Sequence, residues 1–251
     1  MHPECFELFP GRPIYWYGVM VAFAFLLAIA HWSILGRREG VGSGFGTDLG
    51  VWILAFGIIG ARIAYVASHP DLFREEPLSI VRIDQGGLIF FGGFLGGCVG
   101  AVFFARVRGL ALWPLGDLVI TALPLGHVPG RIGCFLNGCC YGRAYDGFLA
   151  VKFPFLKHTV HPVQLYEAGL NALLYLGLLF LYARRRKDGT VVAVYLIGYG
   201  LIRFVMEFFR GDQRHYLGAL SWNQLFCILL VAIGAGLLQR LPARRTALGT
   251  P

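Results

Sequence analysis

Arg131 stands in a glycine-rich stretch at the end of an apolar run, and it is the strongest chemical signal in the chain. The stretch is Gly130–Arg143, read Gly-Arg-Ile-Gly-Cys-Phe-Leu-Asn-Gly-Cys-Cys-Tyr-Gly-Arg, and it follows the apolar run Leu115–Val128 with no room for a solvated linker. A guanidinium group in or at the edge of a bilayer is costly unless an anion meets it, so its presence indicates a function. The usual anion at that depth is a lipid phosphate, and we predict that Arg131 binds one.

A second charged set lies in another apolar run, Thr190–Phe209, and directly after it. Arg203, Glu207 and Arg210 follow one another at i, i+4 and i+7, which places them on one face of a predicted helix. One reading is an ion pair between Arg203 and Glu207 that only neutralises two buried charges. Because a single acid cannot neutralise both of these arginines and a nearby Arg131, spare positive charge favours an anion-binding site.

Polar side chains also mark the starts of two further runs. His161, Gln164 and Glu167 fall on successive turns where a helix is predicted to begin, so Gln164 and Glu167 could fix the tautomer of His161. His161 is then either a proton acceptor or a hydrogen-bonded structural residue.

Tyr17, in the first run, is either an interfacial anchor or part of the site. Arg62, in the second run, needs a partner that the sequence does not name.

Holding such charges within a membrane requires membrane-spanning elements, and the composition predicts them. The chain has 251 residues, of which 57 % are hydrophobic and 14 % charged, and its mean hydropathy is +0.64. A soluble domain carries about a quarter charged residues, so we predict an all-α, polytopic integral membrane protein. Crossing a bilayer takes about 20 apolar residues. Seven runs have this length: Ile14–Leu35, Leu49–Ala67, Gly86–Ala105, Leu115–Phe135, Val163–Ala183, Thr190–Phe209 and Trp222–Gln239.

Basic clusters follow the first, third, fifth and seventh runs, and they fall on one side if every run crosses the membrane. They are Arg37 and Arg38, Arg106 and Arg108, Arg184 to Lys187, and Arg240, Arg244 and Arg245. The positive-inside rule puts this side in the cytoplasm, so we expect the N-terminus outside and the C-terminus in the cytoplasm. Since the clusters are short and adjoin membrane runs, the net charge of +8 does not indicate nucleic-acid binding. Glu4 and Glu7 stand where a secretory signal is basic, so no cleaved signal peptide is expected.

The chain is predicted to form one membrane-embedded domain over residues 1–251, because no internal repeat or low-complexity segment divides it. Residues 136–162 are the longest stretch between runs, and we expect them to form a small cap on the outer face. Gly92, Gly96 and Gly100 make overlapping Gly-xxx-Gly patterns, which predict close packing of the third run against another helix.

The six cysteines do not form a recognisable disulfide framework by spacing. Cys134, Cys139 and Cys140 are the closest group, in the order Cys-x4-Cys-Cys. This order matches zinc-binding motifs poorly, because these combine Cys-x2-Cys pairs with further cysteines or histidines. We therefore expect no metal and no cofactor.

Five segments together carry a resemblance to a known family. They are Trp16-Tyr17-Gly18, Gln85–Gly93, Gly130–Arg143, His161–Glu167 and Tyr199–Arg210. In this order, from the first run to the sixth, the chain resembles the bacterial prolipoprotein diacylglyceryl transferases. The seven-span topology with the N-terminus outside agrees with this resemblance.

The resemblance implies an enzyme of the bacterial cytoplasmic (inner) membrane whose site faces the outer, periplasmic side. It would transfer the diacylglyceryl group of phosphatidylglycerol to the lipobox cysteine thiol of preprolipoprotein signal peptides, and glycerol 1-phosphate would leave. Its partners would be these substrates and membrane lipids, with no nucleic acid and no cofactor. Two other readings stay open: a non-catalytic or divergent relative that binds anionic lipid or lipoprotein precursor, and a small-anion transporter.

The implied site combines arginines that grip phosphate with groups that handle a proton. The expected catalytic residues are Arg131, Arg203, His161 and Tyr17, and the expected phosphatidylglycerol-binding residues are Arg131, Arg203, Asn137, Gly142, Glu207 and Arg210. The chain departs from the family pattern at three positions. Many members carry His in place of Phe91, Asn in place of Cys134 and Glu in place of Cys139. The proton acceptor is therefore expected to be His161, Tyr17 or the field of the arginines acting on the substrate thiol.

Overall fold

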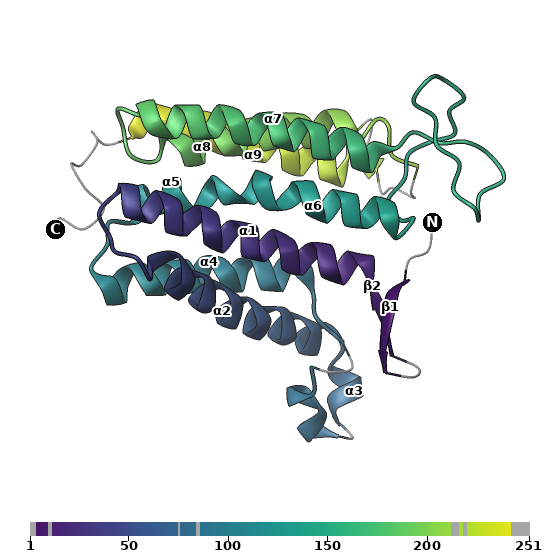
Figure 1. Ribbon diagram of the computed structural model, residues 1–251, viewed down its shortest axis with the longest axis horizontal. Helices are drawn as coiled ribbons and strands as arrows, with labels where there is room; N and C mark the ends of the chain where they lie inside the picture. The colour runs from purple at the N-terminus through teal and green to yellow at the C-terminus, as the bar shows by residue number, and fades with distance from the viewer. Residues whose placement is uncertain are drawn as a thin grey trace. The chain divides into compact units, whose positions relative to one another are not determined.

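The computed structural model describes residues 4–9, 12–74, 76–83, 86–211, 216–217 and 220–241, and this part is mostly helical (Figure 1). The elements in chain order are β1 (Glu4–Phe9), β2 (Arg12–Tyr15), α1 (Trp16–Arg38), α2 (Phe45–Ser68), α3 (Pro70–Arg74), η1 (Pro77–Val81), α4 (Phe90–Arg108), α5 (Leu112–Ile120), α6 (Ala122–Leu136), α7 (Val163–Arg184), α8 (Thr190–Met206), β3 (Tyr216–Leu217), β4 (Leu220–Ser221) and α9 (Trp222–Arg240). Gln85 of the resembling segments and the basic residues Arg244 and Arg245 lie outside the described residues.

The predicted all-α, polytopic membrane fold is confirmed. In the described part of the chain, 6 helical segments are long and apolar enough to cross a membrane, counting α5 and α6 together as Leu112–Leu136. The helix α8 is a shorter apolar helix of 17 residues. Together these segments match the seven predicted runs.

Helix ends differ from the predicted runs by a few residues in most cases, and three of the differences have a clear local reason. The helix α1 begins at Trp16 rather than Ile14, because residues up to Tyr15 pair with β1 in an antiparallel hairpin. The fourth run is two helices, since Pro124 has no N–H to bond the carbonyl of Ile120 and the chain turns between α5 and α6. The helix α8 ends at Met206, so the predicted continuation to Phe209 is wrong.

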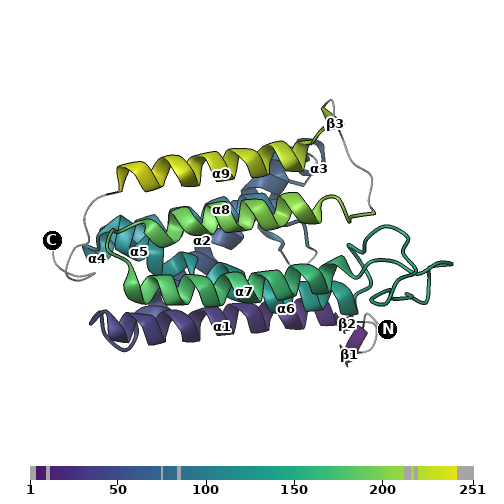
Figure 2. The same ribbon diagram turned by 90° about the horizontal axis from the view of Figure 1, so that it is seen from above.

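The described chain divides into two compact units, and the first contains residues 1–28 and 116–245. In this unit α6 contacts α7, α7 contacts α8 and α8 contacts α9, and Figure 2 shows α7, α8 and α9 side by side. Small residues allow the close approach of α8 and α9. A Cβ atom on Gly234 would lie 2.7 Å from the carbonyl oxygen of Ala193, and one on Gly200 would lie 3.0 Å from that of Cys227. This is the small-residue packing that helices use in lipid, where no hydrophobic effect drives them together.

A buried carboxylate on α5 fixes the start of α8. Asp117 accepts hydrogen bonds from the backbone N–H groups of Gly189 at 2.8 Å, Val191 at 2.9 Å and Val192 at 3.0 Å. These N–H groups have no partner within the helix itself. Arg185 Nε lies 3.5 Å from the same carboxylate and balances its charge. The contact anchors the end of α8 opposite the one that carries Arg203.

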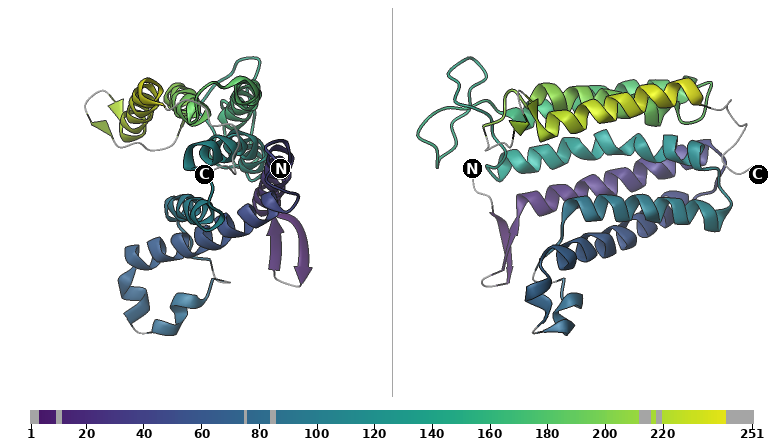
Figure 3. Two further views of the ribbon diagram at one scale, coloured as in Figure 1. Left: turned by 90° about the vertical axis from the view of Figure 1, so that its left-hand side faces the viewer. Right: turned by 180° about the vertical axis from the view of Figure 1, so that it is seen from behind.

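The second unit contains residues 29–115, and its helices α2 and α4 pack along a line of glycines (Figure 3). A Cβ atom on Gly100 would lie 2.7 Å from the carbonyl oxygen of Trp52, and one on Gly96 would meet the carbonyl oxygen of Phe56. Gly92 faces Gly60 in the same way. The prediction that these glycines serve helix packing is confirmed.

Arg62 binds backbone carbonyl groups, which the sequence alone did not identify as its partners. Its guanidinium group donates hydrogen bonds to the carbonyl oxygens of Ser79 at 2.6 Å, Ile80 at 2.7 Å, and Gly86 and Gly87 at 3.1 Å each. The group also lies over the rings of Tyr65 and Phe73, with 5.5 and 5.3 Å from Cζ to the ring centroids. Arg62 thus ties the segment between α2 and α4 to α2, which is a structural task.

Candidate active site

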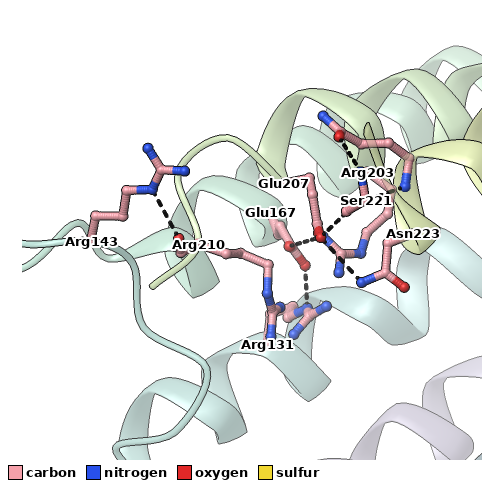
Figure 4. A network of polar contacts seen from close by, with 9 residues as sticks. Arg131, Arg143, Glu167, Arg203, Glu207, Arg210, Ser221 and Asn223 are labelled. Atoms are coloured by element: carbon pink, nitrogen blue, oxygen red, sulfur yellow. Dashed lines mark hydrogen bonds and ion pairs between the residues drawn. The ribbon is translucent and has the colours of Figure 1, made fainter. Parts of the chain in front are cut away.

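Four charged side chains from α6, α7 and the end of α8 form one buried network in the first unit (Figure 4). Arg131 Nε lies 2.5 Å from Glu167 Oε2, and Arg203 Nη1 lies 2.9 Å from Glu207 Oε2 and 3.9 Å from Glu167 Oε1. The carboxylate side chains are only 4 % and 1 % exposed, against 18 % and 16 % for the arginines. The two arginines expected from the sequence are therefore brought together by the fold.

Glu207 is held by residues that the sequence analysis did not single out. Ser221 Oγ donates a hydrogen bond to Glu207 Oε1 at 3.0 Å, and Asn223 Nδ2 donates to the same oxygen at 3.2 Å. Ser221 is also the N-cap of α9, with Gln224 completing a reciprocal capping box. The pattern Ser-x-x-Gln before an apolar run signals that cap in the sequence, but it does not reveal the contact with Glu207.

The charge balance of the network differs from the one predicted. The sequence suggested a single acid near the arginines, whereas Glu167 and Glu207 both belong to the network. Two carboxylates face the guanidinium groups of Arg131 and Arg203, and Arg210 points toward Arg131 from outside α8 (Figure 4). Guanidinium groups gathered in this way suit the negative charge of a phosphodiester.

The ion pair between Arg203 and Glu207 does not use all the hydrogen-bonding capacity of the two side chains. Arg203 Nη1 and Glu207 Oε2 are an ion pair by distance, but neither atom makes a hydrogen bond within the described part of the chain. Both atoms are buried, and the angle between them is unfavourable for a full hydrogen bond although the distance is short. An anionic oxygen of a ligand is the natural acceptor for Arg203.

Arg210 reaches the network by a different route from the predicted one. It was expected on the same helical face as Arg203 and Glu207, but α8 ends before it and the chain turns at residues 207–209. Arg210 instead forms a bridge with Gly142, and its carbonyl oxygen accepts a hydrogen bond from Arg143 Nε at 3.3 Å. The prediction of a common helical face is therefore wrong for Arg210.

Gly142 allows three chain segments to meet beside the site. Its N–H donates to the carbonyl oxygen of His161 at 2.9 Å, and the N–H of Arg143 donates to that of Phe209 at 2.9 Å. A Cβ atom on Gly142 would lie 2.6 Å from both His161 Cβ and the Phe209 carbonyl oxygen. Its structural task is therefore close backbone packing, and contact with lipid stays a prediction.

Arg131 lies on the helix α6 and not in the glycine-rich turn that the sequence suggested. The neighbouring Gly133 serves the packing of α1 on α6, since a Cβ atom there would lie 3.0 Å from Met20 Cβ and 3.4 Å from Tyr17 Cα. Tyr17 thus stands against the helix that carries Arg131, and its side chain is 45 % exposed. A role of Tyr17 in the site stays a prediction.

His161 has other neighbours than the predicted ones. Its ring stacks on Tyr145 with centroids 3.8 Å apart, and Nδ1 lies 3.3 Å from the Tyr166 hydroxyl. Gln164 Nε2 donates instead to the Cys139 carbonyl oxygen at 2.6 Å, and Glu167 pairs with Arg131. The prediction that these two residues fix the tautomer of His161 is therefore wrong. Burial lowers the pKa of His161, so its ring is neutral at pH 7 and able to accept a proton.

Three thiols gather where α6 ends. Gly138 adopts φ +71°, its N–H donates to the Phe135 carbonyl oxygen at 3.1 Å, and the N–H of Cys139 donates to that of Cys134 at 3.1 Å. This is the Schellman arrangement, in which a glycine after the helix reverses the chain. It folds Cys139 back over Cys134, and the sulfur atoms of Cys134, Cys139 and Cys140 all lie within 4.8 Å of one another.

The thiol cluster, meaning Cys134, Cys139 and Cys140, is close to the expected lipid-binding residues. Asn137 caps α6, and its side chain interacts with the Cys139 thiol. A hydrogen bond from Cys134, followed by the charge of Arg210, outweighs burial and lowers the pKa of Cys140 to about 5. Cysteine spacing alone did not predict this cluster; Gly138 after the last apolar residue of α6 is the signal that could have found it.

Comparison with known proteins matches the chain to a family. The family model described as prolipoprotein diacylglyceryl transferase matches residues 3–240. The chain belongs to the prolipoprotein diacylglyceryl transferase family. The predicted family membership is thereby confirmed, and with it the prediction that this diacylglyceryl transferase is an enzyme of a multi-pass membrane type.

Several similar proteins are named phosphatidylglycerol--prolipoprotein diacylglyceryl transferase. One from Pseudoalteromonas translucida is 37 % identical over 233 residues, covering 89 % of this chain and 86 % of its own length. One from Methylibium petroleiphilum is 36 % identical over 250 residues, covering 94 % of each chain. One from Clostridium tetani is 30 % identical over 239 residues, covering 93 % of this chain and 95 % of its own. The likeness to these diacylglyceryl transferases therefore extends over nearly the whole chain.

Proposed function

We propose that this chain transfers the diacylglyceryl group of phosphatidylglycerol to the lipobox cysteine thiol of preprolipoproteins. The thiolate sulfur attacks the glyceryl carbon that carries the phosphate ester. A carbon–sulfur bond forms, the carbon–oxygen bond breaks, and its electron pair leaves on glycerol 1-phosphate. The thiol proton is released to a base. The names of the related proteins and the family match support these substrates.

The buried network of Arg131, Glu167, Arg203 and Glu207 is the observation that carries the proposal. Guanidinium groups bind phosphate oxygens bidentately, and they stabilise the negative charge that grows on the leaving oxygen. In this role Arg131 and Arg203 are catalytic residues. Glu167 and Glu207 are positioning residues, because each holds a guanidinium group in place and keeps the site from carrying excess positive charge.

The remaining expected residues complete the proposed site. Arg210 and Asn137 contribute to binding the lipid headgroup from the segments that follow α8 and α6. Gly142 keeps those segments close together. Tyr17 on α1 and His161 before α7 are the side chains that can accept or relay the thiol proton.

The proposed location is the bacterial cytoplasmic (inner) membrane, with the site toward the periplasmic face. The basic clusters that follow the first, third, fifth and seventh runs support a cytoplasmic position for that end of the helices. Arg131 lies in the second half of α6 and Arg203 in the last turn of α8. Arg184 ends α7 and Lys187 precedes the start of α8, which is the other end of that helix. A lipoprotein precursor that emerges from the membrane would meet the site there.

Lipidation of a peptide by the full-length protein in detergent tests the proposal. The protein is incubated with phosphatidylglycerol and a synthetic peptide that carries a lipobox cysteine. The peptide mass should rise by one diacylglyceryl group, with glycerol 1-phosphate released in equal amount. A peptide with serine in place of that cysteine should stay unmodified. Retention of phosphatidylglycerol without any lipidated peptide would favour the non-catalytic lipid-binding reading.

A further inference from the structure

The thiol cluster has the composition and spacing of a metal site. Sulfur atoms around a tetrahedral zinc ion, with zinc–sulfur bonds of about 2.3 Å, lie about 3.8 Å apart. The sulfur atoms of Cys134, Cys139 and Cys140 already lie within 4.8 Å of one another, so small rotations of the side chains bring them to that spacing. Thiolate donors are soft ligands, and they select zinc, copper(I) or iron–sulfur groups over hard cations.

The backbone holds the cluster in this arrangement. The Schellman turn at Gly138 places Cys139 over Cys134, and buried Gln164 grips the Cys139 carbonyl oxygen at 2.6 Å. Cys140 is the one residue other than glycine with a positive φ, 62°, among the described residues. A left-handed conformation costs a side-chain-bearing residue free energy, and such positions concentrate at functional sites.

The cluster stands beside the lipid-binding arginines and not at a remote surface. Arg131 lies on the same helix as Cys134, one turn earlier, and Arg210 bridges to Gly142, two residues after Cys140.

We propose that Cys134, Cys139 and Cys140 bind one zinc ion whose fourth position takes the lipobox cysteine of the substrate as a thiolate. This inference rests on the proposed transferase function. The described residues place no fourth cysteine, histidine or carboxylate in the cluster. Three protein ligands with one open position are typical of catalytic zinc sites, whereas structural sites have four.

The chemistry fits the reaction. Zinc has no redox chemistry, and the transfer requires none. A thiol that coordinates zinc loses its proton outright, so coordination supplies the ionised sulfur and the proton leaves to solvent, with His161 as a relay. Zinc bound there would hold the lipobox sulfur as the nucleophile. As the carbon–sulfur bond forms at the glyceryl carbon, the carbon–oxygen bond would break and its electron pair would leave on glycerol 1-phosphate. The thioether product, a weak ligand, would then leave the metal.

Metal analysis of the full-length protein is the first test. Protein purified in detergent without chelator should contain about one zinc per chain, the stoichiometry of one such site. Cys134→Ser and Cys140→Ser should each weaken zinc binding by about tenfold or more. Cys98→Ser changes an exposed cysteine on α4, and it should leave the zinc content unchanged. A metal-free protein with three free thiols, a disulfide within the cluster, or copper in place of zinc would overturn the proposal.

Cobalt(II) substitution tests the open position without relying on turnover. The cobalt protein should show thiolate-to-cobalt absorption that the Cys134→Ser variant lacks. In the absence of phosphatidylglycerol, a lipobox peptide should shift the cobalt ligand-field bands, and the peptide with serine in place of the cysteine should not. Equal spectra with both peptides would show a closed, structural site and would overturn the proposal.

Chelation separates this proposal from the proposed function. Removal of zinc should abolish lipidation by the wild-type protein, and added zinc should restore it. Full lipidation activity of the zinc-free protein would contradict the zinc proposal but not the proposed transferase function. A cobalt site that responds to the cysteine peptide, in a protein that never lipidates it, would instead contradict the proposed function.

Discussion

Each arginine of the buried network has a distinct partner, so single substitutions separate their tasks. Arg131→Ala removes a guanidinium group that pairs with Glu167 and is placed to grip phosphate. Loss of one such charge-stabilising donor costs about 100- to 1,000-fold in turnover. We expect lipidation to fall by that factor, measured per folded molecule in detergent. Arg131→Lys should be nearly as poor, because lysine lacks the planar fork.

A matched control for Arg131 lies elsewhere in the first unit. Arg184, in the last turn of α7, stacks on the Phe180 ring and takes no part in the network. Arg184→Ala should therefore keep lipidation within about threefold of wild type, since it removes an exposed charge only. Near wild-type turnover of Arg131→Ala would contradict a phosphate-binding role.

Arg203 and Glu207 should differ in severity although they form one ion pair. Arg203→Ala removes a phosphate partner, and we expect a loss comparable with that of Arg131→Ala. Glu207→Gln keeps an oxygen that accepts hydrogen bonds from Ser221 and Asn223. The lipidation rate of this variant should therefore fall less, by about tenfold. Protein abundance and activity per folded molecule are measured for both variants. Equal loss of abundance with normal specific activity would mean that the pair is purely structural.

His161 tests how the substrate thiol ionises. Burial lowers the pKa of His161, so in the wild type its protonation should reduce activity only below about pH 6.5. General-base catalysis is worth about 100- to 10,000-fold, whereas a zinc-bound thiol needs no strong base. We therefore expect His161→Gln to lower the lipidation rate by less than about 100-fold.

Two outcomes for His161→Gln, a much larger loss of rate or no loss at all, would revise the role of His161. A loss greater than about 100-fold would make it the principal base and remove the need for ionisation by zinc. An unchanged rate from pH 6 to 9 would make it structural, which is also the task that its contacts with Tyr145 and Tyr166 suggest.

At the scale of elements, the segments that follow α6 and α8 meet through backbone contacts that leave no room for a side chain. Gly142→Ala would place Cβ 2.6 Å from the Phe209 carbonyl oxygen and from His161 Cβ. Overpacking of this kind costs about 1–3 kcal/mol. We expect a clear fall in thermal stability in detergent, together with reduced activity, because Arg210 bridges to Gly142.

Gly177→Ala is the matched control for this contact. Gly177 lies within α7, and nothing approaches the position of its Cβ within 4 Å. Alanine there should be neutral or stabilising by up to about 1 kcal/mol, from helix propensity alone. If both variants melt like wild type, the close approach at Gly142 does not limit stability.

At the scale of the whole molecule, the orientation in the membrane decides which compartment supplies the substrates. Lys152, between α6 and α7, and Lys187, between α7 and α8, are both exposed. In a background with all 6 native cysteines replaced by serine, Lys152→Cys should react with an impermeant thiol reagent added to intact cells. Lys187→Cys should react only after the membrane is opened. The reverse pattern would place the site on the cytoplasmic side.

The sequence by itself determined the membrane architecture, and it singled out the charged residues of the candidate site. Runs of apolar residues long enough to cross a bilayer leave helices as the main solution, because backbone groups in lipid must bond within their own segment. Arg131 and Arg203 stood out since a buried cation is costly without an anion. The glycines of α4 were likewise interpreted correctly, because their spacing is set by the helix itself.

Tertiary structure alone decided which side chains meet. Local periodicity grouped Glu167 with His161 and put Arg210 on α8, but the contacts across α6, α7 and α8 pair Glu167 with Arg131, and the end of α8 sends Arg210 to Gly142. The support of Glu207 by Ser221 is a contact between residues 14 positions apart on different helices. The thiol cluster depends on a left-handed turn after α6. Spacing in the sequence cannot specify such contacts, since they depend on where helices stop and which faces pack.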